Sequence, residues 1–562
     1  MKNRIKQYLL AASMCVGLTA CSDFFEPIPG VQFGLDETFA SKQRTEEYLN
    51  NVYSYVREVT DAIHPNTYGG IFTEASLDGA NRWNKTYAEW TNGSFNSASA
   101  QASEYFSKYY QAIAKASTFI QNVDKCTEAA ASTRGKWKSE ARALRAYYYF
   151  ELLRLYGPIP LIGEDPIPLD ASLEELIKER NSVDECVNFI ATELQSAIDS
   201  GDLLQRAGKA NLGRMDVATC MALKAKLYLY WASPLFNGNT DQASVKNKDG
   251  KQLFPQTEDN SKWAQARDAY ERFMTFAAGQ GYKLTEVYTN GKLDPYASCR
   301  AAGEFFTTTW EAVDELIFVK LRDLYDYTYW VCPKFTDFQD TDVTGGGGYY
   351  TTQETVDLFF TKDGLTIEED PGYDKFEGIP SANNFTSGRY YDPNNPSRLY
   401  FDADKSKVLK QWKDREPRFY VNITYSGSIW LNEGKYNEEM RTDFTNGANG
   451  TCGKSKASGD CPDSGYLIRR GAKASNNNGS KHFSPVLRLA DMYLGYAEAL
   501  CMCSDLDNAL TYLNKIRVRA GIPEYTFTAT AGKITCPKTQ TDLLNRIRRE
   551  RLVELVFEWN RY

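Results

Sequence analysis

Two short segments of the chain place aromatic rings beside amide, carboxylate and guanidinium groups. Residues 78–92 have the sequence DGANRWNKTYAEWTN, and residues 325–330 have the sequence YDYTYW. Aromatic faces stack against the flat faces of sugars, bases or peptides, and neighbouring polar groups can hydrogen-bond to the same ligand. The chain holds 37 Tyr and 10 Trp, more rings than a globular core needs. These segments therefore predict a binding surface whose ligand class the residues alone leave open.

Catalytic and metal-binding side chains are scarce by comparison. The chain has two histidines, His64 and His482, so a zinc site or a Ser-His-Asp triad would be hard to assemble. Cys501 and Cys503 fall within a helical pattern, where small buried residues are the simpler interpretation. The side chains therefore favour binding over catalysis.

One acidic cluster, residues 368–370, invites two further interpretations. Paired carboxylates carry out glycoside hydrolysis, and carboxylate oxygens bind calcium. Adjacent residues in one loop do not set the separation that hydrolysis needs, and the cluster lacks the spacing of an EF-hand. We therefore expect a solvated loop, no catalysis and no cofactor, and a structural calcium ion stays an unsupported alternative.

The first residues of the chain have the pattern of an export signal. Residues 1–6 carry three positive charges, residues 8–18 are apolar, and small residues precede Cys21. This order predicts a signal peptide over residues 1–20. A cysteine directly after small residues predicts cleavage before Cys21 and lipid on its thiol, with a plain signal and a chance cysteine as the alternative. Residues 21–40 would then form a lipidated tether at a membrane.

Charge and cysteine content narrow the possible partners. Loss of the signal peptide would take the formal net charge from −8 to −11, which argues against nucleic acid as a partner. Of the 12 cysteines, Cys15 leaves with the signal and Cys21 carries the lipid. Cys452 and Cys461, in a loop rich in Gly and Ser, are the best candidates for a disulfide in an exported chain. The remaining cysteines form no recognisable framework.

Residues 41–282 have the periodicity of packed helices. Ser182 and Glu185 form a capping box, and an amphipathic run follows it with apolar residues at four-residue spacing. Residues 215–232 and 262–278 continue the pattern with alanines at positions where helices approach closely. Successive helix pairs of this length predict a scaffold of helical hairpins of the tetratricopeptide kind.

The middle of the chain, residues 283–482, has a different composition. It is rich in Gly, Asn, Asp and aromatic residues, and it contains four consecutive glycines at residues 345–348. Residues 315–319 and 420–424 have the pattern of short strands between loops. Long loops on a rigid scaffold commonly carry binding sites. We therefore expect a loop-rich α/β insertion that carries the ligand site.

Helices return in residues 483–562. Residues 488–502 and 506–519 predict another hairpin, and Thr539 is expected to cap a final helix that runs through Trp559. No helix stop precedes the last residue, so this C-terminal region is expected to be truncated relative to a longer protein.

These segments together resemble the SusD/RagB family of outer-membrane lipoproteins from Bacteroidetes. Each motif is weak alone, but their shared order over nearly the whole chain is specific. The motifs are CSDFF at 21–25, EARALRAYYYF at 140–150, LYGPIPL at 155–161, DREPRF at 414–419, RLADMYLGYAEA at 488–499, LNKIRVRAG at 513–521 and ERLVEL at 550–555. A further stretch that follows the last motif in the family is missing here, in keeping with truncation.

The resemblance implies both a fold and a role. The fold is mainly α, a SusD-like scaffold of tetratricopeptide hairpins with an irregular insertion. The role is nutrient uptake: a lipid-anchored protein of the outer membrane, facing the cell exterior, binds carbohydrate and delivers it to a SusC-like TonB-dependent transporter. The resemblance implies polysaccharide utilization without catalysis.

Sugar capture requires flat rings for C–H groups and polar groups for hydroxyls. In the two aromatic segments we expect Trp83 and Trp330 to act as stacking platforms and Asn81 and Arg82 to bind hydroxyls. The remaining candidate ligand residues of these segments are Trp90, Tyr327 and Tyr329. The alternative is that these rings pack between the insertion and the scaffold.

Three other functions remain open at this point. A RagB-like protein would keep the architecture and capture oligopeptides for the same kind of transporter. A surface glycoside hydrolase would release reducing ends from a polysaccharide. A purely structural repeat protein would leave the aromatic loops without a purpose.

Overall fold

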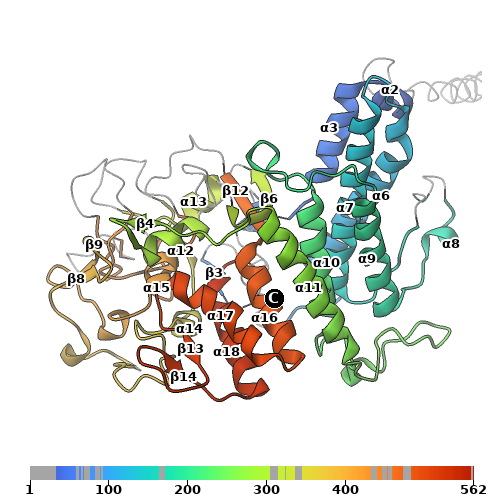
Figure 1. The fold of residues 1–562 in the computed structure, drawn as a ribbon. Helices are drawn as coiled ribbons and strands as arrows, with labels where there is room; N and C mark the ends of the chain where they lie inside the picture. Colours follow the sequence, from blue (N-terminus) through green and yellow to red (C-terminus); the bar gives the residue numbers. More distant parts are fainter. Residues whose placement is uncertain are drawn as a thin grey trace, which may run out of the picture.

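The fold was analysed in a computed structural model of the 562-residue chain (Figure 1). The residues that the structure describes are 33–57, 63–64, 67–68, 76, 78–82, 89, 93–163, 167, 171–303, 314–322, 325–335, 345–376, 378–431, 440–445, 452–453, 459–472, 482–558 and 561. The predicted signal peptide, Cys21 and most of the tether lie outside this range.

The N-terminal part is a row of long helices. Each helix from α6 to α11 packs against the next long one in the chain, and α11 packs in turn against the C-terminal helix α16. Figure 1 shows these helices standing side by side. The helical scaffold is thus as predicted, while its assignment to the tetratricopeptide class stays a prediction. The helices are α2 Leu35–Ala40, α3 Lys42–Tyr53, α6 Ala100–Asn122, α7 Ala131–Tyr156, α8 Leu173–Leu176, α9 Val183–Asp199, α10 Val217–Ala232 and α11 Ser261–Gly279.

Local signals in the sequence explain several of these helix ends. The capping box at the start of α9 is confirmed: Ser182 accepts from the Glu185 amide, and the Glu185 carboxylate accepts from the Ser182 amide at 2.7 Å. Helix α7 ends at Gly157, whose φ of 69° is a conformation that side chains with a Cβ rarely adopt. Caps of this kind satisfy backbone groups that a helix end leaves without partners.

The middle of the chain consists of short helices and strands. Its largest sheet has four strands in the order β10–β11–β7–β3, and β12 pairs with β6 to carry the chain back to the helices. Elements here are α12 Pro295–Gly303, α13 Tyr325–Val331, α14 Gln353–Leu358, α15 Pro417–Asn422, β3 Ala80–Asn81, β6 Leu316–Arg322, β7 Tyr349–Tyr350, β10 Ile423–Tyr425, β11 Tyr466–Ile468 and β12 His482–Arg488. Paired short strands elsewhere are β1 Ile63–His64 with β2 Thr67–Tyr68, β4 Tyr288–Thr289 with β5 Lys292–Leu293, β8 Arg389–Asp392 with β9 Asn395–Asp402, and β13 Tyr525–Thr526 with β14 Ile534–Thr535.

Two of the predicted elements were wrong in part. Residues 420–424 were expected to form a strand, but α15 continues to Asn422 and only β10 is extended. Pro417 occupies the first turn of α15, where its fixed φ and missing N–H favour a helix start. The final helix, α18 Gln540–Glu554, is capped by Thr539 as predicted but ends before Trp559, which lies outside the described residues.

Three C-terminal helices connect the two halves of the molecule. Helix α16, Leu489–Met502, contacts α10 and α11 of the scaffold, while α17, Leu506–Ala520, and α18 contact α12 and α14 of the middle part. In Figure 1 these helices lie between the upright helices and the loop-rich part. They therefore hold the loop-rich part in a fixed position against the scaffold.

A buried network of ion pairs reinforces this junction. Arg488, at the end of β12, contacts Glu315 at 2.8 Å, Glu554 at 2.7 Å and Glu558 at 2.9 Å, and all four side chains are buried. Burial raises the pKa of Glu554, but Arg519 and Arg488 outweigh it and hold that pKa well below its ordinary value. The turn after α18 directs Glu558 into the same network, which gives a physical reason for the early end of that helix.

The disulfide expected between Cys452 and Cys461 does not form in the structure. Both sulfurs are buried as thiols. No helix in the described part of the chain combines the length and apolar composition of a membrane span.

Candidate ligand-binding site

The two aromatic segments identified from the sequence meet at the edge of the four-stranded sheet. Asn81 in β3 is paired with Tyr349 in β7, and the Arg82 amide donates to the Gly348 carbonyl at 3.0 Å. The Gly348 amide donates in turn to the Trp330 carbonyl at 3.2 Å. One glycine therefore connects the first segment to the second.

The four consecutive glycines allow this close approach. The amides of Gly346 and Gly347 donate to carbonyls of α13 and its end, at 2.8 Å to Tyr329 and 2.9 Å to Cys332. A Cβ on Gly346 would lie 2.5 Å from the Trp330 ring, closer than any real Cβ contact. The sequence indicated a loop here, whereas the structure shows backbone packed directly beneath the rings of α13.

Two rings of the second segment are partly exposed and one is not. Tyr329 and Trp330 pack edge to face with their centroids 4.9 Å apart, and both are half-buried. Tyr327 is 2% exposed, and its hydroxyl donates to the Arg470 carbonyl at 2.7 Å. Tyr327 therefore supports the site from the core and offers no face to a ligand.

Polar groups surround these rings. Arg82 donates to the Cys461 carbonyl at 3.0 Å and forms an ion pair with Asp463, whose side chain is half exposed. Lys334 forms a second ion pair with Asp460 at 2.5 Å. Asn81 is buried at 6% exposure, whereas the side chains of Arg82, Asp460 and Asp463 are partly exposed. Trp83 and Trp90 lie outside the described residues.

A groove that the sequence did not predict lies beside this sheet. It has a volume of about 580 Å³, and its aromatic lining consists of the half-buried Phe376 and Phe444 and the buried Trp412 and Tyr466. The Trp412 indole donates to the Tyr466 hydroxyl at 3.0 Å, which donates to Gln353 at 2.7 Å. Tyr466 begins β11, the strand next to β7. Trp412, two residues before the DREPRF motif, was a sequence signal that could have identified it.

Two parts of the chain match models of known protein families. Residues 315–562 match a family model described as the SusD family. Residues 32–229 match a second one, described as starch-binding associating with outer membrane. The chain belongs to the SusD/RagB family. This SusD-like chain is therefore a member of a carbohydrate-binding family that is associated with the outer membrane.

Individual relatives are more distant. A SusD-like protein from Bacteroides ovatus is 27% identical over 175 residues, and the match spans 30% of this chain and 30% of the relative's length. The solved structure of the protein BT4246 has a TM-score of 0.73 at 24% identity and covers 93% of this chain and 88% of its own. A SusD-like carbohydrate binding protein from Bacteroides fragilis has a TM-score of 0.63 at 18% identity, with 93% and 86% covered. These structures confirm the mainly helical SusD-like fold.

The acidic cluster of the SusD-like chain has a local structural role. Glu369 lies 3.2 Å from Arg546 of α18, and Asp370 accepts from the Gly372 amide at 2.8 Å. Among the described residues, no group of three or more potential metal ligands converges. The cluster thus stabilises a turn against α18.

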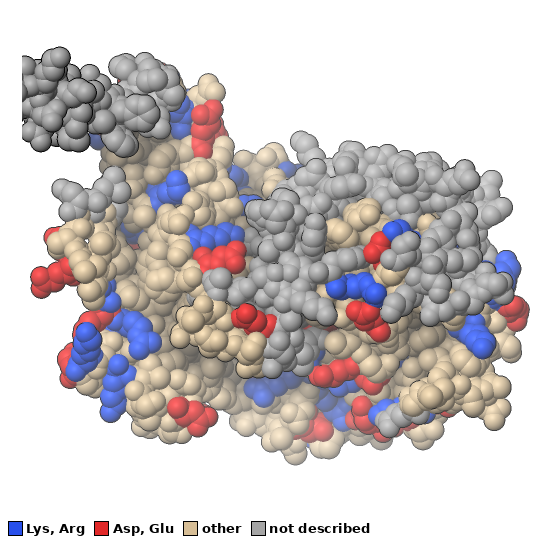
Figure 2. Space-filling model, turned by 180° about the vertical axis from the view of Figure 1, so that it is seen from behind, with Lys and Arg blue, Asp and Glu red and all other residues tan. Residues whose placement is uncertain are grey.

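Charges of both signs are mixed on the surface of the molecule. On the face drawn in Figure 2, the described Lys and Arg side chains are interspersed with Asp and Glu among uncharged residues. A surface on which charges of both signs are intermixed lacks the extended potential of one sign that attracts a highly charged polymer. The described part of this face therefore shows no large area of a single charge.

Proposed function

We propose that this SusD-like chain is a surface-exposed lipoprotein of the outer membrane that binds oligo- or polysaccharide and passes it to a SusC-like TonB-dependent transporter, without catalysis. The observation that carries the proposal is the junction of Arg82, Gly348 and Trp330. It places a guanidinium and a pair of half-buried rings, Tyr329 and Trp330, at one sheet edge. The family match and the outer-membrane description of the second family model support it.

The arrangement suits a sugar for physical reasons. A pyranose ring has apolar C–H faces that pack on aromatic rings, while its hydroxyls need donors and acceptors around the rim. Tyr329 and Trp330 supply the first, and Arg82 with Asp463 and Asp460 supplies the second. Salt-bridged side chains cost little entropy on binding, because their partners already hold them in place. The neighbouring groove, with the half-buried rings of Phe376 and Phe444, would extend the surface for a longer glycan.

Lipid on Cys21 would do more than retain the protein at the membrane. A flexible tether keeps a domain at high effective concentration over a partner while allowing it to move away. The chain would then act as a mobile cap that presents ligand to the transporter. Delivery, unlike binding, would depend on the lipid.

A binding panel tests the proposed function and its alternatives. The full chain, purified in detergent, is titrated by calorimetry with neutral and acidic oligosaccharides and with a peptide digest. Saturable binding of at least one glycan supports the proposal, and peptide binding without sugar binding contradicts it in favour of oligopeptide capture. Incubation with the same polysaccharides should release no reducing ends. Release would show that the protein is a hydrolase.

A further inference from the structure

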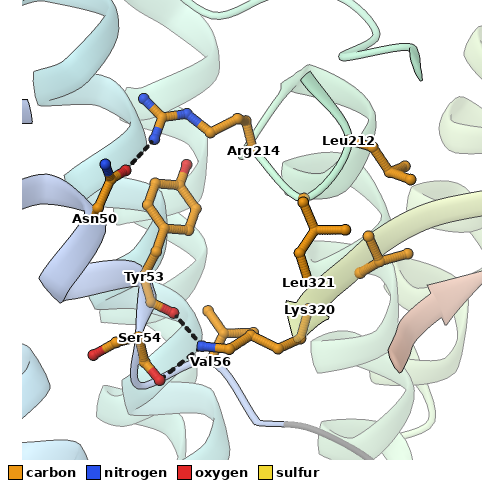
Figure 3. Close-up of a pocket in the computed structure, with 10 residues that line it drawn as sticks. Asn50, Tyr53, Ser54, Val56, Leu212, Arg214, Lys320 and Leu321 are labelled. Carbon is orange, nitrogen blue, oxygen red and sulfur yellow. Dashed lines mark hydrogen bonds between the residues drawn. The ribbon is translucent and has the colours of Figure 1, made fainter. Parts of the chain in front are cut away.

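The cavity of about 550 Å³ beside α3 and β6 has cations that the protein itself engages. Arg214 lies above Tyr53 and donates to Asn50 at 3.0 Å (Figure 3). Lys320 donates to the carbonyls of Tyr53 and Ser54, as the dashed lines in Figure 3 show. The groove beside the four-stranded sheet differs from this cavity in one respect, which concerns a carboxylate.

This groove of about 580 Å³, which we call the α14 groove, is lined by a chain of hydrogen bonds that runs in one direction. The Trp412 indole can only donate, and it donates to the Tyr466 hydroxyl at 3.0 Å. That hydroxyl donates to the side-chain oxygen of Gln353 at 2.7 Å, and the Gln353 amide donates to Oδ1 of Asp357 at 2.7 Å. The chain therefore ends on a carboxylate, which can only accept.

The second oxygen of this carboxylate is available to a ligand. Gln353 and Asp357 lie four residues apart in α14, so they share one face of the helix. Within the described part of the chain, Oδ1 of Asp357 accepts from Gln353, whereas Oδ2 accepts no hydrogen bond and the carboxylate forms no ion pair. Burial raises the pKa of Asp357 against the lowering effect of Gln353, so the carboxylate has lost part of its hydration. A hydroxyl donated by a ligand would replace the lost hydrogen bond to water.

Aromatic rings lie in the same groove as this acceptor. Phe376 and Phe444 are half-buried, whereas Trp412 and Tyr466 are buried at 7% and 4% exposure. The two phenylalanines therefore supply the accessible aromatic surface. The volume of the groove falls within the range of about 300–1,000 Å³ that is typical of small-ligand sites. Apolar rings beside a hydrogen-bond acceptor are the combination that a sugar requires, because its ring has C–H faces and its rim has hydroxyls.

The charges that line the α14 groove favour a neutral sugar. Asp357 and Lys375 are the charged side chains among the described lining residues, and their signs are opposite. A uronic acid would bring a second carboxylate to Asp357, and an amino sugar would bring a second ammonium to Lys375. Either pair of like charges repels, whereas a neutral sugar avoids both penalties.

We propose that the α14 groove binds a neutral sugar residue and that a hydroxyl of this sugar donates to Oδ2 of Asp357. The inference rests on the proposed glycan-binding function and adds to it the charge class of the sugar and the residue that selects it. Gln353 follows Gly348 by five residues, so their backbones are at most about 18 Å apart. The α14 groove is therefore a neighbour of the glycine junction.

A comparison of ligands tests the charge class. The full chain in detergent is titrated by calorimetry with tetramers of glucose, galactose, mannose and xylose, and with the charged tetramers of galacturonic acid and glucosamine. At least one neutral tetramer should bind, about fivefold or more tightly than either charged one. A charged tetramer that binds as tightly as the best neutral one overturns the inference and leaves the proposed function intact. Absence of binding by all of the tetramers also overturns it, and the wider panel then decides on the proposed function.

A substitution that alters one oxygen tests the role of Asp357. Asp357→Asn keeps the acceptor for the Gln353 amide and places an amide donor where Oδ2 was. It should weaken binding of the best neutral tetramer about tenfold and reduce the preference over galacturonic acid, whereas general damage to the fold would leave that preference unchanged. Asp363→Asn is the matched control, since Asp363 is 60% exposed, pairs with Lys362 and does not line the groove. Unchanged affinity in Asp357→Asn overturns the inference.

A second variant keeps the test decisive if Asp357→Asn fails to fold. Phe376→Ala removes a half-buried ring from the groove and should weaken binding of the neutral tetramer about fivefold or more. Phe106→Ala is its control, because Phe106 is 38% exposed and lies outside the groove. Thermal unfolding of each variant checks the fold. Equal affinity of the folded Phe376→Ala and Phe106→Ala proteins for the neutral tetramer rules out this groove as a sugar site.

Discussion

Arg82 and Trp330 are joined through the two backbone hydrogen bonds of one residue, Gly348, although they lie in distant parts of the chain. The pairing of β3 with β7 sets this contact, and the neighbouring glycines let the backbone run directly under the Trp330 ring. The backbones of the two aromatic segments are therefore held next to each other. The relationship explains how an irregular insertion can hold a defined site.

Substitution of a junction glycine should damage both stability and binding. In Gly346→Ala, the added methyl group would lie 2.5 Å from the Trp330 ring, so the ring or the backbone must shift. Overpacking of this kind costs about 1–3 kcal/mol in unfolding free energy. Gly279→Ala is the control, because a Cβ there meets nothing within 4 Å. Chemical denaturation of the two variants checks the difference, and equal stability would show that the junction is not tightly packed.

The buried ion pairs predict a large effect for one arginine. Arg488→Met leaves the carboxylates of Glu315, Glu554 and Glu558 without a central cation, which should cost about 3–5 kcal/mol. Arg548→Met is the matched surface control, since Arg548 is half exposed and, within the described part of the chain, its ion pair is with Glu498 at 3.3 Å. Its loss should cost less than about 1 kcal/mol. Similar unfolding free energies for both variants would contradict the role of the network at the junction.

Asp216, the N-cap of α10, predicts a specific pH dependence. Burial raises its pKa from 3.8 to about 6, against the lowering effect of bonds from Thr219 and Ala207. The native state keeps this proton to higher pH than the unfolded chain does, so stability falls as pH rises from about 4 to 6 and is then constant. Asp216→Asn lacks the titrating group and should lack this change.

The effect is measured as a difference between two proteins. Between pH 7 and pH 4, the free energy of unfolding of the native chain should rise by about 3 kcal/mol at most relative to that of Asp216→Asn. Chemical denaturation of both proteins at each pH measures this difference. Carboxylates with lowered pKa values, such as Glu185 with a pKa of about 2, contribute equally to both proteins and cancel. A difference that stays constant over this range would refute the raised pKa.

Removal of the lipid site should separate binding from delivery. A Cys21→Ala variant that is still exported and folded should bind glycan with unchanged affinity, because the change leaves every residue of the proposed site in place. Glycan uptake by cells that carry it should fail, because the protein no longer stays over the transporter. Growth on the glycan as sole carbon source provides the measurement, and normal growth would show that the lipid is dispensable.

Features governed by neighbouring residues were predictable from the sequence. The capping box of Ser182 and Glu185 and the stop of α7 at Gly157 both follow from short motifs, and both are present in the structure. The motif order also identified the family before any fold was known. Because such signals depend on a few adjacent residues, they can be recognised in the sequence without knowledge of the fold.

Features that depend on distant residues were not predictable. The strand expected at residues 420–424 is largely helical because Pro417 starts a turn that tertiary packing completes. Tyr327 was chosen as a ligand residue, yet the Arg470 carbonyl and the core enclose it. The groove of Trp412 and Tyr466 was missed because only the pairing of β11 with β7 brings it beside the predicted site. Contacts between residues that are far apart in the chain leave no pattern in the sequence around either residue.

The proposed function depends on glycan binding by the rings at the Arg82–Trp330 junction. Calorimetric titration of Trp330→Ala with a glycan that binds the native chain tests it most directly, with Tyr288→Ala as a control at a ring that is 60% exposed on β4. On the scale of aromatic stacking against nucleobases, loss of a stacking ring costs about 1–3 kcal/mol, so Trp330→Ala should bind at least about fivefold more weakly. Tyr288→Ala should bind normally. Unchanged affinity in Trp330→Ala, with the fold intact, would show that these rings do not bind the glycan.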